Sequence, residues 1–238
     1  MDVLYFLKER TAFIRQFYEV AAAPYLERHR KIEAGEDPFE QPYVDESSIG
    51  EPAYLKEYGE ADESLHVLAY SCVSMLAAAL HLYFTTWEKL FQVSAAKAFK
   101  AEFKKGWLAG YNAYLTHHIG VSFENCPANL KLLEEVIIVR NRIEHPESSV
   151  EHHGAIANVK THFSASDLKK LPHPFFLDKF DRDRLAELGD MDEAEKAWLV
   201  SPTLHVTGEK LIAAIAEVET FCGWLEEQIL TAVRRRSP

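Results

Sequence analysis

The sequence predicts a mainly α protein that folds as an antiparallel helical bundle. Apolar residues recur at helical spacing in several long segments, and 47 % of the 238 residues are apolar, which is enough to bury a sizeable core. The sequence contains no Walker loop, GxGxxG or GxSxG motif. Nothing in it therefore supports a nucleotide-binding α/β fold or an α/β-hydrolase.

Residues 1–31 are predicted to form an N-terminal helix that packs on the bundle. Leu4, Leu7, Ile14 and Phe17 lie at helical spacing, and Pro24 is expected to bend or break the helix. Residues 32–63 contain three prolines and three glycines, and they hold eleven acidic side chains against one basic side chain. We therefore predict an acidic connector over residues 32–63, with short helical turns in a surface loop.

Residues 64–87 contain no Asp, Glu, Lys or Arg. A run of this length can span a bilayer, but it includes His, Ser and Thr and no second such run exists. We therefore expect a central helix of the bundle, continuing to residue 105 and ended by Gly106. Lys97, Lys100 and Lys104 recur on it at near-helical spacing. This lysine stripe is either a solvated helix face or a contact to an RNA backbone.

The rest of the bundle is predicted from shorter stretches of the sequence. Residues 111–125 indicate a short helix and a loop. Residues 128–145 indicate a strong helix that Pro146 stops. Residues 155–163 and 199–206 predict two short strands, which together would make a small β-hairpin around an acidic insertion near 164–198.

A final helix is expected after Thr207, which is a good N-cap, and through Val233. Its predicted buried face consists of six residues at helical spacing: Leu211, Ile215, Val218, Cys222, Leu225 and Ile229. Residues 64–233 would thus form one bundle, and residues 234–238 a basic tail.

Net charge and cysteine usage narrow the functional classes. The formal charge of −11 argues against a nucleic-acid partner. However, residues 32–63 and 178–195 carry −10 and −5, so the rest of the chain carries +4. The three cysteines form no CxxC pair, and the first residues do not form a secretory signal. We expect a cytoplasmic protein without a disulfide framework and without a membrane span.

The most informative stretch is VIIVRNRIEHPE at residues 136–147. Arg140, Asn141 and His145 come together in the last turn of an apolar-faced helix, with Asn141 and His145 as i,i+4 neighbours. A guanidinium binds phosphate well, and a histidine transfers protons near pH 7. The alternative is structural: Arg140 and Glu144 form an ordinary i,i+4 ion pair, and a basic residue stabilises a helix C-terminus.

The RNRIEH segment resembles the R-N-x-x-x-H signature of HEPN domains, an all-helical family that forms dimers. The order of long helices over residues 64–233 is also similar. The resemblance implies a homodimer whose two motifs meet in a cleft, and many such domains are metal-independent endoribonucleases. His145 would act as general acid or base, Arg140 would stabilise developing charge, and Asn141 would orient His145 or the phosphate.

The resemblance therefore favours a HEPN-type endoribonuclease that acts on RNA without a metal or other cofactor, as a toxin or phage-defence effector with an antitoxin partner. A second hypothesis is a non-catalytic HEPN dimer that serves as a binding or regulatory module. A third is a metal-dependent helical-bundle enzyme, which would need at least three histidines or carboxylates at one point.

Overall fold

The computed structural model describes residues 2–40, 52–144, 162–171 and 174–236. The fold over these residues is mainly α. The α-helices are α1 (Val3–Ala34), α2 (Leu55–Phe91), α3 (Ala95–Ala98), α4 (Lys100–Phe103), α5 (Trp107–Ile119), α6 (Leu130–Glu144), α7 (Ala165–Lys170), α8 (Lys179–Glu187), α9 (Glu193–Val200) and α10 (Gly208–Arg236), with a 3₁₀ turn at Phe123–Asn125.

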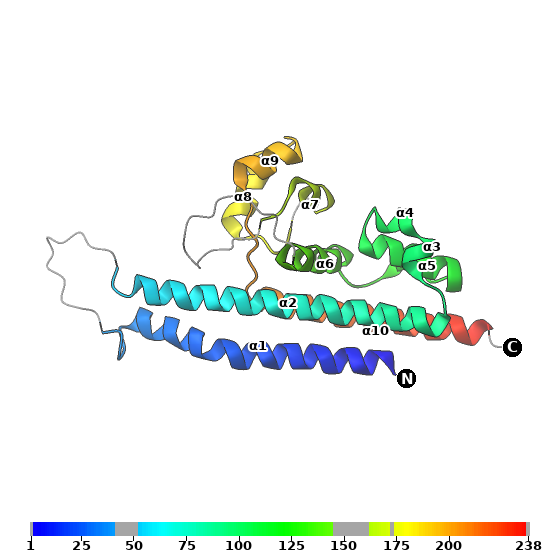
Figure 1. Ribbon diagram of the computed structural model, residues 1–238, viewed down its shortest axis with the longest axis horizontal. Helices are drawn as coiled ribbons and strands as arrows, with labels where there is room; N and C mark the ends of the chain where they lie inside the picture. The colour runs from blue at the N-terminus through cyan, green and yellow to red at the C-terminus, as the bar shows by residue number, and fades with distance from the viewer. Residues whose placement is uncertain (1, 41–51, 145–161, 172–173, 237–238) are drawn as a thin grey trace.

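The long helices build three layers (Figure 1). Helix α1 lies on one side and packs against α2 and α10, which run side by side through the middle. Helices α5 and α6 and the shorter helices cover the other side of α2 and α10. The six residues predicted to face the core on α10 are all fully buried, so that prediction is confirmed.

Helix α1 is longer than expected and is not broken at Pro24. Its first turn is capped by Asp2, whose Oδ1 accepts a hydrogen bond from the backbone N–H of Tyr5 at 2.8 Å. The helix then continues through Pro24 to Ala34 and ends at Gly35, which has a φ of 62°. A left-handed residue of this kind terminates a helix at low cost when it is glycine.

The connector predicted at residues 32–63 is wrong in its extent. Residues 32–34 belong to α1, and α2 begins at Leu55, while residues 41–51 lie outside the described part of the chain. Good helix formers between residues 55 and 63 outweigh Gly59, and Lys56 and Glu60 approach to 3.8 Å as an i,i+4 pair. Part of the acidic segment is therefore helix.

The central helix ends earlier than predicted. Helix α2 stops at Phe91 because Gln92 adopts the left-handed conformation with a φ of 58°. The backbone N–H of Val93 then bonds back to the carbonyl of Glu88 at 3.2 Å, which closes the helix end. Two one-turn helices, α3 and α4, follow in place of the continuous helix that was expected to reach residue 105.

The predicted hairpin is reduced to single contacts where the structure describes it. His162 and Thr203 form one antiparallel bridge, and Leu177 and Leu204 form another. Residues 199 and 200 end α9 instead of starting a strand, and residues 155–161 lie outside the described residues. The acidic insertion near 164–198 is built from α7, α8 and α9, each with a Ser or Asp side chain that caps its N-terminus.

Helix α2 is apolar and long enough to cross a membrane by length and composition alone. Half of its most apolar window is buried inside the structure, where α1, α6 and α10 pack on it. The core helix of a soluble bundle has the same properties, so α2 is weak evidence for a membrane span.

Candidate functional site

Helix α6 is held firmly by its apolar face and by two consecutive glutamates. Glu134 accepts hydrogen bonds from the backbone N–H groups of Trp107 and Leu108, at 2.7 and 2.8 Å, and so caps the N-terminus of α5. Glu135 does the same for the backbone N–H groups of Phe175 and Phe176, at 2.8 and 2.6 Å. Helix α6 is thus joined to the start of α5 and to residues 175–176 before it reaches its last turn.

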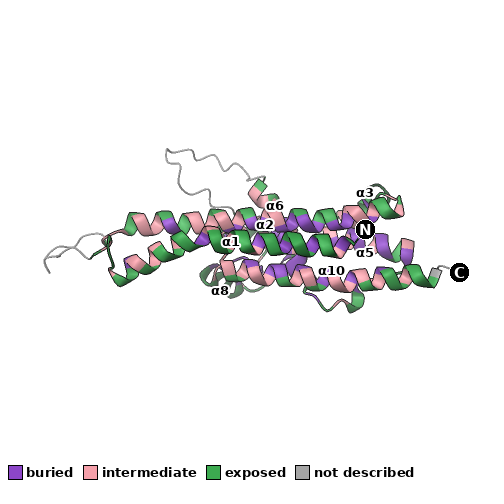
Figure 2. Ribbon diagram, turned by 90° about the horizontal axis from the view of Figure 1, so that it is seen from below, coloured by how far each residue is buried: buried purple, intermediate pink, exposed green. Residues whose placement is uncertain are grey.

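The last turn of α6 projects past α2, where the helix becomes exposed (Figure 2). Arg140 and Asn141 lie in this turn and touch each other: Nη1 of Arg140 donates to Oδ1 of Asn141 at 3.1 Å. Nη2 of Arg140 lies 2.6 Å from Oε2 of Glu144. The Arg140 side chain is 41 % exposed, so solvent or a ligand reaches its guanidinium.

His145 follows Glu144 in the chain and lies outside the described residues. The structure therefore brings together Arg140 and Asn141 of the predicted site. The ion pair expected between Arg140 and Glu144 is present as well. An exposed guanidinium beside an amide can bind a phosphate oxygen, and a carboxylate at the water-exposed rim is a weak competitor for it.

Arg142 also lies near the end of α6, and the motif gave it no predicted role. Its Nε donates to Oδ2 of Asp167 at 2.6 Å, and its Nη2 donates to Oγ of Ser164. Ser164 and Asp167 form the capping box of α7. The side chain of Arg142 therefore joins α6 to α7. Of the two arginines near the end of α6, Arg140 is the more exposed. The Ser-x-x-Asp spacing of Ser164 and Asp167 is typical of a capping box, and this feature of the sequence could have predicted the start of α7.

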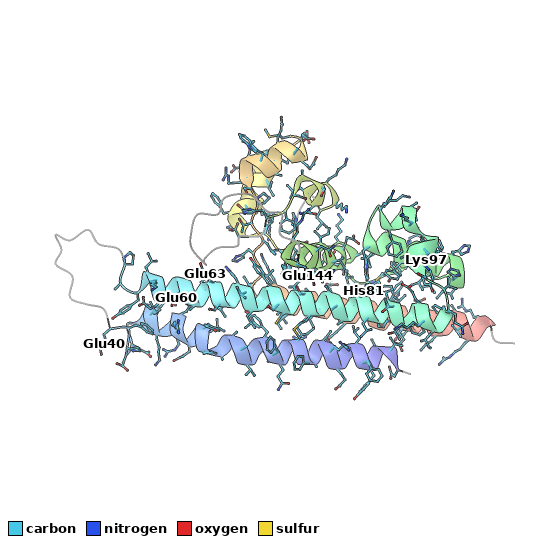
Figure 3. All side chains as sticks on the ribbon, in the orientation of Figure 1. Glu40, Glu60, Glu63, His81, Lys97 and Glu144 are labelled. Carbon is cyan, nitrogen blue, oxygen red and sulfur yellow. The ribbon has the colours of Figure 1, made fainter. Side chains whose placement is uncertain are left out.

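The lysine stripe does not lie on one helix, so that prediction is wrong in its geometry. Lys97 is in α3, Lys100 begins α4, and Lys104 follows the end of α4, because α2 ends at Phe91. All three lysines are exposed. Figure 3 shows Lys97 well separated from Glu144 along the molecule, so this group does not adjoin Arg140.

Strongly shifted pKa values occur elsewhere, around Glu135 and Lys210. Burial raises the pKa of Glu135 to about 7, although the N–H groups of Phe176 and Phe175 oppose the shift. Burial likewise lowers the pKa of Lys210 to about 8. Lys210 Nζ donates to the backbone carbonyls of Leu177 and His205. Such shifts often mark active sites, but the hydrogen-bond partners of both groups are backbone atoms of one loop region.

We conclude that Glu135 and Lys210 hold residues 175–177 and 205 against the bundle and have a structural role. In the sequence, each of them stands beside one other charged residue, Glu134 or Glu209, and nothing in that pattern distinguishes them from residues of a solvent-exposed helix face. No group of three or more His, Cys, Asp or Glu that could hold a metal ion occurs within the described ranges.

Comparison with known proteins gives no match: no family model, no curated protein and no solved structure is similar to the chain. The resemblance to HEPN domains therefore depends on the RNRIEH segment and on the order of the long helices.

Proposed function

We propose that the protein is a metal-independent endoribonuclease of the HEPN type that acts as a homodimer, with Arg140, Asn141 and His145 at its site. The observation that carries this proposal is the direct contact of Arg140 and Asn141 in the exposed last turn of α6. The RNRIEH segment supplies His145 one residue beyond that turn.

The proposed reaction uses the RNA's own 2′-hydroxyl as nucleophile. The 2′-oxygen forms a bond to the adjacent phosphorus while the bond from phosphorus to the 5′-oxygen breaks. The 2′-proton leaves to a base, and the 5′-oxygen gains a proton, so the products are a 2′,3′-cyclic phosphate and a 5′-hydroxyl. His145 would act as general acid or base. Arg140 would stabilise the charge on the phosphorane, and Asn141 would orient His145 or the phosphate.

Glu144 has a defined place in this proposal. In the free protein it pairs with Arg140 through one nitrogen–oxygen contact, and an RNA phosphate would replace it because a phosphate can accept two hydrogen bonds from a guanidinium. A cytoplasmic toxin or phage-defence effector, kept in check by an antitoxin partner, is the biological role that we propose for such an activity.

The same ion pair supports the second candidate function. If Arg140 remains bound to Glu144, its guanidinium is neutralised and the turn is a stabilised helix end. The protein would then be a non-catalytic HEPN module that binds a partner or ligand.

The test is incubation of RNA in EDTA with the full chain, with H145A and with R140A. We expect cleavage by the parent chain, and a loss of about 100-fold or more in each variant, as is typical when a general acid–base or charge-stabilising group is removed. R184A, which removes an exposed arginine of α8, is the matched control and should cleave as the parent does. Equal cleavage by parent and H145A, or no cleavage, would contradict the proposal.

A further inference from the structure

Helices α8 and α9 project from the bundle and carry exposed aromatic side chains. Figure 1 shows α9 as the element that lies farthest from α1, and α9 packs mainly on α7 and α8. Trp198 of α9 is 81 % exposed, Leu199 beside it is 43 % exposed, and Phe180 of α8 is 65 % exposed. The other three tryptophans of the chain are buried or half-buried.

The fold of α8 and α9 does not use the Trp198 ring. Leu185 and Val200 are the buried apolar residues of the two helices. Asp181 is buried as well, and its Oδ2 accepts a hydrogen bond from the backbone N–H of Thr203 at 2.8 Å. The Trp198 ring, in contrast, contacts no aromatic ring or cation of the described residues. A tryptophan displayed in this way is typical of a binding surface, because tryptophan is enriched among the residues that dominate interfaces.

The charged side chains of this unit leave a negative surface. Residues 178–195 carry a net charge of −5. Its basic side chains are largely engaged: Nη2 of Arg182 donates to the carbonyl of Leu177 at 3.2 Å, and Nζ of Lys196 lies 3.9 Å from Oε1 of Glu193. A surface of this kind attracts a cationic partner. Four of its exposed acidic side chains have no ion pair with another described residue: Asp183, Glu187, Asp190 and Glu195.

Glu195 brings this negative charge next to Trp198. The two residues are three positions apart on α9, so their side chains lie on the same face of the helix. Leu199 follows Glu195 by four positions and shares that face. A partner that lies on Trp198 therefore meets a carboxylate and an apolar surface together. This combination suits an arginine side chain, which has an apolar stem and a flat cationic head.

Helix α8 already contains a contact of this kind. The guanidinium carbon of Arg184 lies 5.5 Å from the centre of the Phe180 ring, which is within the range of a cation–π interaction. A tryptophan ring attracts a cation more strongly than a phenylalanine ring does. An arginine from a partner would therefore make a stronger contact at Trp198 than the one that α8 makes within itself.

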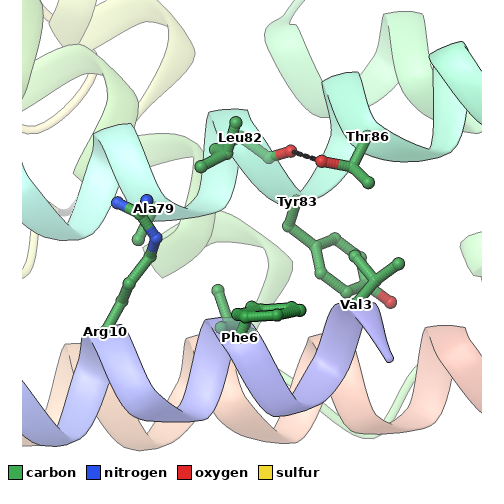
Figure 4. A pocket seen from close by; sticks show the side chains of 8 residues that line it. Val3, Phe6, Arg10, Ala79, Leu82, Tyr83 and Thr86 are labelled. Carbon is green, nitrogen blue, oxygen red and sulfur yellow. Dashed lines mark hydrogen bonds between the residues drawn. The ribbon is translucent and has the colours of Figure 1, made fainter. Parts of the chain in front are cut away.

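The apolar seam between α1 and α2 has no comparable charge. A hollow of about 160 Å³ there is lined by Phe6 and Leu82, and Arg10 reaches from α1 across to Ala79 of α2 (Figure 4). The adjoining hollow of about 400 Å³ has both Glu9 and Arg10 in its wall. Because these two charges are opposite and adjacent, the seam does not favour a partner of either sign.

We propose that the outer face of α9, centred on Trp198, binds an arginine-rich segment of a partner protein. One guanidinium of the segment stacks on the Trp198 ring, and another pairs with Glu195. The other unpaired carboxylates of α8 and α9 attract the segment at longer range. RNA is disfavoured at this face because its phosphates carry the same sign of charge as these carboxylates.

This proposal does not rest on the proposed ribonuclease. Its surface belongs to α9, whereas the proposed ribonuclease site is on α6, and peptide binding is measured without RNA. A failure of either proposal therefore leaves the other standing.

The test is fluorescence anisotropy of a labelled octa-arginine peptide, titrated with the full chain at low ionic strength. We expect saturable binding with a Kd of about 100 µM or tighter. W198A should weaken binding by about threefold to tenfold, because it removes the cation–π contact, and W198F should retain most of the affinity. E195Q should weaken binding by about twofold to fivefold.

Two variants on α1 are the matched controls. F13A removes another exposed aromatic ring, and E19Q removes another exposed carboxylate, so both should bind the peptide as the parent does. Far-UV circular dichroism checks that each variant is folded. A parent chain that does not bind the peptide, or equal affinities of the parent and W198A, would overturn the proposal.

A second titration distinguishes a protein partner from RNA. W198A should leave the affinity for a labelled single-stranded RNA unchanged, and an octa-glutamate peptide should not bind the parent chain. If W198A weakens RNA binding more than peptide binding, or if octa-glutamate binds as tightly as octa-arginine, the face on α9 is not a site for an arginine-rich segment.

Discussion

Arg140 and Arg142 lie two residues apart on α6, and their surroundings give them different roles. Arg142 is bound to Ser164 and Asp167 and is mostly buried, so removing it would disturb the junction with α7. Arg140 is half-exposed and pairs with Glu144 and Asn141 at the surface. A surface ion pair contributes little to stability, and this makes Arg140 available to a phosphate.

A substitution of Glu144 tests whether the Arg140 guanidinium can bind a phosphate. E144Q removes the carboxylate that competes for Arg140, so we expect tighter RNA binding, by about threefold to tenfold at low salt. Fluorescence anisotropy with a labelled single-stranded RNA measures this. E19Q, which removes one exposed negative charge on α1, is the matched control for the change in net charge. An equal gain in both variants would show that Arg140 is not a specific phosphate ligand.

The buried carboxyl group of Glu135 is expected to make the folded state less stable as pH rises. Its pKa is raised to about 7 in the folded protein because burial disfavours the carboxylate. The folded state therefore binds more protons than the unfolded state between about pH 4.5 and 7. The free energy of unfolding should fall as pH rises through this range, by up to about 3 kcal/mol from this group.

Denaturant unfolding of the parent and of E135Q at a series of pH values measures the effect. The variant cannot titrate at this position, so the stability advantage of the parent over E135Q should shrink as pH rises from 4.5 to 7. A constant or growing advantage over that range would contradict the assigned direction.

At the scale of elements, two glycines with opposite surroundings test the packing. A Cβ added at Gly110 of α5 would overlap the ring of Phe103, so we expect G110A to lower the free energy of unfolding by about 1–3 kcal/mol. A Cβ at Gly59 of α2 meets nothing within 4 Å. G59A should therefore raise the free energy of unfolding by about 0.5–1 kcal/mol.

Chemical denaturation of both variants checks this, and F103L should recover part of the loss in G110A because it vacates the ring position. If G110A is as stable as the parent, Phe103 does not pack on α5 as described.

The sequence was most informative where one helical face is apolar and the ends are clearly marked. The buried stripe of α10 was predicted residue by residue, and α6 was placed to within two residues at its start. The end of α2 was missed because Gln92, a residue with no strong preference for the left-handed conformation, terminates it. The start of α2 was missed because acidic residues with a nearby glycine and proline are typical of both a loop and a helix N-terminus.

The candidate site could be predicted only in part. The i,i+4 spacing of Arg140 and Glu144 on one helix determines that their side chains meet, so that ion pair follows from the sequence. The hydrogen bond from Arg140 to Asn141 was not predicted. Arg142 binds residues of the α7 cap that lie 22 to 25 residues further along the chain. This contact, and the exposure of Arg140 beside it, depend on tertiary packing that helical spacing does not predict. The role of Glu135 depends in the same way on a loop that is 40 residues away in the chain.

At the scale of the whole molecule, the charge of −11 is unevenly placed. Acidic side chains gather at the connected end of α1 and α2, and the lysines of α3 and α4 lie far from that end (Figure 3). The overall charge therefore does not describe each part of the surface, and any electrostatic argument about a partner has to use the local charge.

The most direct test of the proposed chemistry is the nature of the RNA ends made in EDTA. Incubation of end-labelled RNA with the full chain, followed by gel electrophoresis before and after acid treatment and phosphatase, distinguishes the products. We predict a 2′,3′-cyclic phosphate and a 5′-hydroxyl, and neither product with H145A. A 3′-hydroxyl with a 5′-phosphate, cleavage that requires a divalent metal, or unchanged cleavage by H145A would contradict the account.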